Sequence, residues 1–116
     1  MLAKANRLLL ADDFRVTMRN GRKVSAGSIV LYTKRDLGNP QARFGFVVAK
    51  TVGNAITRNL VKRRLRMLAR EALLQIPTGT DVVVRALPAA ATADWNKLST
   101  EFKTGITKAF ETDIRR

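Results

Sequence analysis

A long amphipathic pattern over residues 55–76 constrains the fold of this chain more than any other feature. At 100° per residue, one arc of the segment is apolar and carries Val61, Leu65, Leu68, Ala69, Ala72 and Ile76. The opposite arc is cationic and carries Lys62, Arg63, Arg66 and Arg70. Pro77 and Gly79 follow, and both residue types end helices. The pattern predicts a helix from about Ala55 to Gln75 with one buried face and one basic outer face.

The basic face lacks neighbouring acids. Between Leu37 and Arg70 there are no acids and eight bases, namely Arg43, Lys50, Arg58, Lys62, Arg63, Arg64, Arg66 and Arg70. The whole chain has 22 Lys and Arg against 9 Asp and Glu, a net charge of +13. Like charges on successive helical turns repel each other. We therefore expect a polyanionic partner, a nucleic acid, rather than an ordinary solvated helix face.

Shorter apolar patterns predict the rest of the fold. Asp12 or Asp13 is expected to cap a helix that ends at Gly21 and stacks Phe14 on Met18. Strands are expected over residues 27–34, 43–50 and 80–88, and a last helix over residues 92–110. The order α-β-β-α-β-α fits an α/β sandwich, a small mixed sheet with helices packed on it.

The strand over residues 43–50 has two different faces. Its bulky face carries Phe44, Phe46 and Val48, whereas its small face carries Gly45, Val47 and Ala49. We expect the bulky face to be core and the small face to admit a ligand.

The chain is expected to be one RNA-binding domain over residues 1–116, with loose basic ends at about 1–7 and 112–116. Its 116 residues, 46% of them hydrophobic, suffice for one core. The absence of Cys suits a reducing cytoplasm. The N-terminal apolar run is broken by Asp12 and Asp13, and no later run has membrane-spanning length. We expect a cytoplasmic protein without a membrane or an obligate protein partner.

Other features of the sequence allow more than one interpretation. Gly53 and Asn54 before the long helix are either a plain turn or a phosphate site with Lys50 and Arg58 on either side. With no His, no Cys and no metal-ligand cluster, catalysis is the weakest interpretation, and no metal-binding residue is predicted. A metal-dependent nuclease using Asp12, Asp13 and Asp81 and a ribosomal or other structural RNA-binding protein remain as alternatives.

The middle of the chain, "FGFVVAKTVGNAITRNLVKRRLRMLARE", resembles the core motif of the bacterial ribonuclease P protein family. The segments "NRLLLADDFRVTMRNG" and "DVVVRALP" resemble that family in the same order. The resemblance implies a non-catalytic protein cofactor of an RNA enzyme that matures the 5′ end of tRNA. It further implies Mg²⁺ held mainly by the RNA subunit, and an α/β sandwich with a left-handed β-α-β crossover.

The resemblance also assigns two sets of contact residues. The set expected to bind the ribonuclease P RNA subunit is Asn54, Arg58, Asn59, Lys62, Arg63, Arg66 and Arg70. The set expected to bind the 5′ leader of precursor tRNA is Phe14, Met18, Val30, Tyr32, Val47, Lys50 and Arg85, with Phe14 and Tyr32 offering flat rings to its bases. Two positions depart from the family pattern, which has an Arg where this chain has Leu60 and an aromatic residue where it has Met18. Arg64, one turn after Leu60, is expected to compensate.

Overall fold

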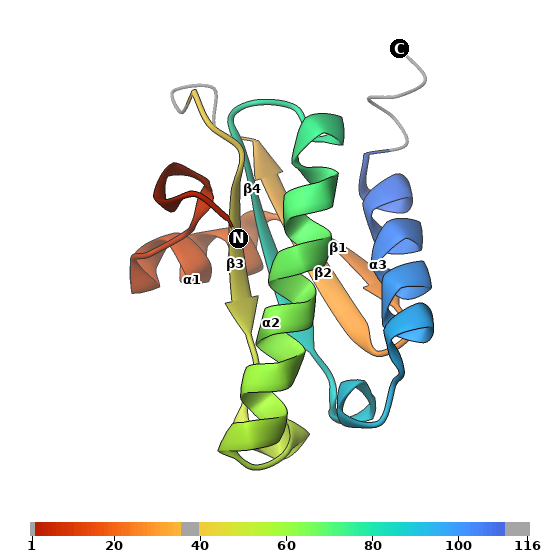
Figure 1. Cartoon of the computed structure of the whole chain (residues 1–116). Helices are drawn as coiled ribbons and strands as arrows, with labels where there is room; N and C mark the ends of the chain where they lie inside the picture. Colours follow the sequence, from red (N-terminus) through yellow and green to blue (C-terminus); the bar gives the residue numbers. More distant parts are fainter. Residues whose placement is uncertain (1, 36–39, 111–116) are drawn as a thin grey trace.

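A four-stranded mixed sheet organises the chain, and the structure, a computed structural model, describes residues 2–35 and 40–110 (Figure 1). The strands lie in the order β1-β2-β4-β3. Their bounds are β1 Arg22–Ala26, β2 Ile29–Arg35, β3 Arg43–Val47 and β4 Thr80–Ala86. The α-helices of the described part are α1 Ala11–Asn20, α2 Ala55–Ala72 and α3 Trp95–Ala109. Short 3₁₀ turns lie at Lys4–Asn6, Lys50–Val52, Leu73–Gln75 and Pro88–Ala91.

The connection from β3 through α2 to β4 has an unusual hand. β3 and β4 are neighbouring parallel strands. In Figure 1, α2 lies in front of the sheet, both strands run downward, and β4 lies to the right of β3. This is the left-handed sense, whereas nearly all such crossovers are right-handed. The predicted α/β fold and its left-handed crossover are confirmed.

The main core lies between the sheet and the pair α2 and α3. Every residue of the apolar arc predicted over residues 55–76 is buried, as is the row Leu98, Phe102, Ile106, Ala109 and Phe110 predicted for the last helix. The bulky face of β3 also faces this core, because Phe44 and Val48 are buried in it and Phe46 packs against it. The predicted end of the long helix near Gln75 is confirmed, since its last turn continues as the 3₁₀ turn Leu73–Gln75.

A smaller apolar cluster lies on the other face of the sheet, which α1 covers in part. Its buried members are Leu8, Val30, Tyr32 and Val83, and its partly buried members are Phe14, Met18, Val47 and Leu87. We call this set the second apolar cluster. Residues from α1, β2, β3 and β4 meet in it, so it exists only in the folded chain.

Strand β1 was not predicted. Residues 27–28, expected to begin a strand, instead form a two-residue hairpin turn, and Gly27 has a φ of +60°. The signal was present in the sequence, because Gly-Ser between apolar runs is typical of a tight hairpin. It was missed because only Val24 and Ala26 of β1 face the core.

The predicted cap of α1 is wrong. The N-cap residue is Leu10, whose side chain makes no capping hydrogen bond, and Asp12 and Asp13 lie in the first turn. Carboxylates in the first turn still stabilise a helix through its dipole. The predicted end at Gly21 is confirmed, since its N–H donates to the carbonyl of Thr17 at 2.9 Å.

The N-terminal segment is packed rather than loose. Leu2 and Leu8 are buried, and Leu8 N–H donates to the carbonyl of Phe44 at 2.8 Å. Asn6 Nδ2 also donates to the carbonyl of Ala42 at 2.8 Å. These bonds cover the open edge of β3, which would otherwise invite pairing with another chain. The predicted loose end at 112–116 lies outside the described residues. None of the described helices is both long and apolar enough to span a membrane.

Candidate nucleic-acid interface

The outer face of α2 presents the predicted cations to solvent. Asn59, Arg63, Arg66 and Arg70 are exposed, and Lys62 is half-buried. The apolar arc on the opposite side is held in the core, so the helix cannot rotate to hide these charges. Glu71 is the first acid after Leu37 and lies in the last turn of α2. The face is therefore a fixed strip of positive potential.

Part of this strip is hollowed. A hollow of about 370 Å³ is lined by Asn59, Lys62, Arg63, Arg66 and Met67. Met67 is 53% exposed and is the apolar member of this lining. The hollow combines three cations, an amide and a polarisable thioether, groups that suit an RNA surface with its phosphates and base edges. Met67 was not among the predicted contact residues.

The arginines of α2 do not all behave alike. Arg58 is half-buried, and its Nε has no acceptor among the described residues. Arg64 instead donates from Nη1 to the carbonyl of Ala93 at 3.1 Å, tying α2 to the segment before α3. Compensation for Leu60 by Arg64 is therefore not supported, because this guanidinium serves the fold. Leu60 is half-buried and lies outside the core cluster.

The start of α2 is a capped turn. Asn54 is the N-cap residue, and its side-chain oxygen accepts from the N–H of Thr57 at 2.9 Å. The carbonyl of Asn54 accepts from the N–H of Arg58 at 2.9 Å. These two hydrogen bonds support the interpretation of Gly53 and Asn54 as a plain turn before the helix. Asn54 is exposed, as is Lys50 in the preceding 3₁₀ turn, so both stand at the helix N-terminus where anions are favoured.

The predicted leader residues come together on the other face of the sheet. Phe14, Met18, Val30, Tyr32 and Val47 all belong to the second apolar cluster. Arg85 of β4 pairs in register with Val30 on one side and Val47 on the other. Residues opposite each other in a sheet project from the same face. Arg85, which is exposed, therefore rises between two apolar residues of the cluster.

Burial differs within this set. Tyr32 is only 7% exposed, so its ring forms the floor of the cluster rather than an open stacking surface. Phe14 is half-buried and lies over Gly45. The parts of this face open to a ligand are Phe14, Met18, Val47 and Arg85.

The acids of the nuclease alternative are held by arginines. Asp81 accepts from Nε and Nη2 of Arg43 at 2.8 Å each, and Arg43 Nη1 lies 3.6 Å from Asp13. Asp12 pairs with Arg15 one turn away. Within the described ranges, no group of three or more His, Cys, Asp or Glu side chains could hold a metal ion. Sequence reasoning missed the Arg43–Asp81 pair, although opposite charges near the starts of two strands are a usable signal.

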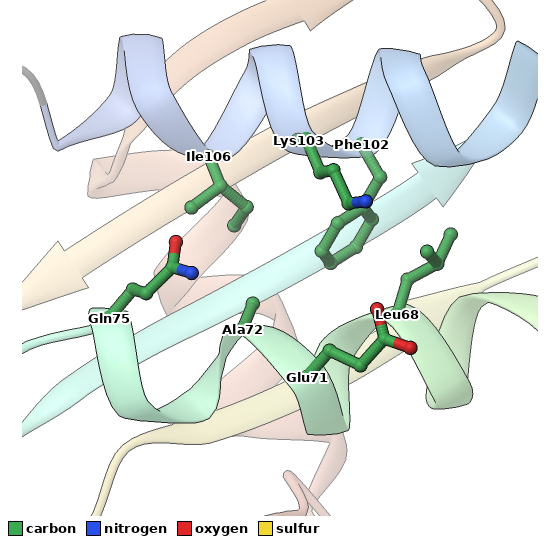
Figure 2. Close-up of a pocket in the computed structure, with 7 residues that line it drawn as sticks. All are labelled: Leu68, Glu71, Ala72, Gln75, Phe102, Lys103 and Ile106. Atoms are coloured by element: carbon green, nitrogen blue, oxygen red, sulfur yellow. The ribbon is translucent and has the colours of Figure 1, made fainter.

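A further hollow of about 240 Å³ lies between α2 and α3 (Figure 2). Leu68 and Ala72 of α2 face Phe102 and Ile106 of α3 across it. Glu71 lies on its α2 side and Lys103 on its α3 side. Because this hollow is lined by both an acidic and a basic side chain, its charge differs from that of the basic strip on α2.

The comparisons with known proteins agree with this geometry. The family model for ribonuclease P matches residues 2–110. The ribonuclease P protein component of Arthrobacter sp. (strain FB24) is 46% identical over 116 residues, which cover 100% of this chain and 82% of the relative. That of Kocuria rhizophila is 43% identical over 109 residues, covering 94% of this chain and 96% of the relative.

Solved structures show the same fold. The RNase P protein of Staphylococcus aureus superposes with a TM-score of 0.84 at 26% identity, covering 91% of this chain and 96% of that one. The RNase P protein of Thermotoga maritima superposes with a TM-score of 0.74 at 25% identity, covering 84% and 92%. Both the sequence and the fold of the chain match these proteins over nearly its whole length. The chain belongs to the ribonuclease P protein family.

Proposed function

We propose that this chain binds the ribonuclease P RNA subunit through the outer face of α2 and supports 5′ maturation of tRNA in the cytoplasm. The observation that carries the proposal is the basic strip on α2, which no acid interrupts between Leu37 and Arg70. Each cation that meets a phosphate releases a counterion, and this release favours binding. Arg58 adds to the support, because its buried Nε lacks an acceptor among the described residues and an RNA phosphate would supply one.

We propose that the second apolar cluster binds the 5′ leader of precursor tRNA. Apolar and aromatic side chains accept bases of any sequence, because every base has an apolar face. Phe14, Met18 and Val47 would contact the bases, and Arg85 and Lys50 would meet the phosphates. Val30 and Tyr32 would form the floor. This division suits a protein that must accept many different leaders.

The protein is proposed to be non-catalytic by itself. The carboxylates of Asp13 and Asp81 lie against Arg43, whose positive charge opposes a metal ion between them. Mg²⁺ is therefore proposed to be held mainly by the RNA subunit. The position of Arg43 beside the carboxylates of Asp13 and Asp81 also disfavours the metal-dependent nuclease.

Reconstitution tests the proposal. The chain, the RNA subunit and a precursor tRNA should together give 5′ cleavage at low Mg²⁺, whereas the chain alone should give none. A protein with Arg58, Arg63 and Arg66 changed to Ala should lose this effect, while one with Lys97, Lys103 and Lys108 of α3 changed to Ala should keep it. Equal loss in both proteins would show that total charge, rather than the α2 face, is responsible. Binding to unrelated structured RNA with equal affinity would favour the structural RNA-binding alternative.

A further inference from the structure

The face that carries the second apolar cluster continues onto β1, the edge strand next to β2. Lys23 of β1 pairs with Tyr32 of β2, and Ser25 pairs with Val30. Residues paired across two strands project from the same face of a sheet. Because Tyr32 and Val30 are buried members of the cluster, Lys23 and Ser25 stand directly beside it.

Two rows of paired residues cross all four strands on this face, from β1 at one edge of the sheet to β3 at the other (Figure 1). The first row is Lys23, Tyr32, Val83 and Gly45, and the second is Ser25, Val30, Arg85 and Val47. Neighbouring strands lie about 4.8 Å apart, so each row is about 14 Å long. The floor formed by Val30 and Tyr32 therefore has a cation on each side, Arg85 of β4 and Lys23 of β1.

The two β1 side chains are open to a ligand. Lys23 and Ser25 are exposed, whereas Tyr32 between the cations is only 7% exposed. Among the strand residues of this face the one acid is Asp81, and Arg43 bonds both of its oxygens. Within residues 2–35 and 40–110, no acid forms an ion pair with Lys23. The charge of Lys23 is thus available to a phosphate.

We propose that Lys23 binds a phosphate in the part of the 5′ leader farthest from the tRNA, with Ser25 as its polar neighbour. This inference rests on the proposed leader function of the second apolar cluster. Lys50 follows β3 and precedes α2, the proposed RNA-subunit face, so a leader that enters there reaches β1 last. A lysine ammonium binds phosphate as a point charge beside any base, which suits leaders of many sequences.

Precursor tRNAs with leaders shortened one nucleotide at a time test the inference, in the holoenzyme assembled from the full chain and the RNA subunit. Lys23→Ala should weaken binding of the longest leaders by about 2- to 5-fold, the effect of one exposed ion pair, and should leave the shortest leaders unaffected. The log–log salt slope for the longest leaders should fall by about 0.7. Lys108→Ala, at an exposed position on the α3 side of the sheet, is the matched control and should behave like the wild type at every length.

Ser25→Lys is the complementary variant, because it adds a cation beside Val30. Ser25 is exposed, so the fold should tolerate the longer side chain. Binding of the longest leaders should become about 2- to 5-fold tighter, and the salt slope should rise by about 0.7. Thr104→Lys, which adds the same charge at an exposed position of α3, should give neither effect.

The alternative role for Lys23 is to discourage pairing of the β1 edge with another chain, as lysines on edge strands do. If Lys23→Ala matches Lys108→Ala at every leader length while Phe14→Ala weakens binding of leader-bearing substrates, Lys23 has only that role. The inference is then overturned and the leader function stands. If wild-type affinity does not depend on leader length, the proposed leader function fails, and this inference fails with it.

Discussion

The ring of Phe14 lies directly on Gly45, so that a Cβ added to Gly45 would lie 2.5 Å from Cε2 and 2.6 Å from Cζ of Phe14. The same Cβ would lie 3.1 Å from Cβ of Leu8. Glycine is therefore required here for close packing between β3 and α1. The contact sets the height of Phe14 above the sheet, and with it the shape of the face proposed to bind the leader.

Gly45→Ala should push the Phe14 ring away from the sheet. We expect affinity for precursor tRNA with a leader of several nucleotides to fall by about 5- to 150-fold, since stacking on one aromatic ring is worth about 1–3 kcal/mol per base. Affinity for mature tRNA should not change in the same holoenzyme. Binding assays with the two substrates check this. Equal loss for both substrates would place Phe14 outside the leader site.

Arg85→Ala tests the charged part of the leader face without disturbing its core. Because Arg85 is exposed, the free energy of unfolding should change by less than about 0.5 kcal/mol. Precursor tRNA binding should weaken, and its log–log salt slope should fall by about 0.7 for one lost contact to a single strand. Lys108→Ala, on the α3 side of the sheet, is the control. An unchanged slope for Arg85→Ala would remove this residue from the site.

Salt dependence tests the α2 face. Affinity for the RNA subunit should fall with salt at a log–log slope of several units, and Arg66→Ala or Arg70→Ala should each reduce that slope by about 0.7–0.9. Filter binding over a range of KCl concentrations measures it. A slope near zero in the wild type would contradict the electrostatic account.

Asp81→Asn separates a structural from a catalytic role. Arg43 and Asp81 join the parallel strands β3 and β4 through two hydrogen bonds, and the side chain of Asp81 is 8% exposed. Loss of the charge should lower the free energy of unfolding by about 1–3 kcal/mol. Asp12→Asn, at a side chain 83% exposed, should change it by less than about 0.5 kcal/mol. Folded Asp81→Asn protein should still support cleavage in the reconstituted holoenzyme; a folded but inactive variant would revive the nuclease alternative.

Leu60→Arg tests the departure from the family pattern. Leu60 is half-buried and lies outside the core cluster, so the fold should survive with less than about 1 kcal/mol of change in unfolding free energy. Affinity for the RNA subunit should stay the same or increase. Leu65→Arg, at a position with 0% exposure, should unfold the protein and serves as the contrast. Comparable destabilisation by both changes would show that Leu60 is part of the core.

Local sequence patterns were enough to predict the three helices and the charged face of α2. Helical periodicity is local, and the apolar row that Val61, Leu65 and Leu68 begin allows only one face of α2 to be buried. The cations on the opposite arc must then face outward. The same reasoning found the buried row of α3, but it missed β1, whose five residues place only two side chains in the core. It also misjudged the N-terminal segment, because Leu2 and Leu8 have apolar partners only once β3 is in place.

Which residues from distant segments meet depends on the packing of the whole chain and could not be read from local patterns. The second apolar cluster draws on α1, β2, β3 and β4. Family resemblance indicated five of its members, namely Phe14, Met18, Val30, Tyr32 and Val47, but not Leu8, Val83 or Leu87. The pairing of β3 with β4, its left-handed crossover and the Arg43–Asp81 pair depend on which strands become neighbours. The same holds for the buried hydroxyl of Thr80, which has no hydrogen-bond partner in the part of the chain that the structure describes. A strand pattern specifies which face is buried, but the choice of neighbour is made by the packing of the whole sheet against its helices.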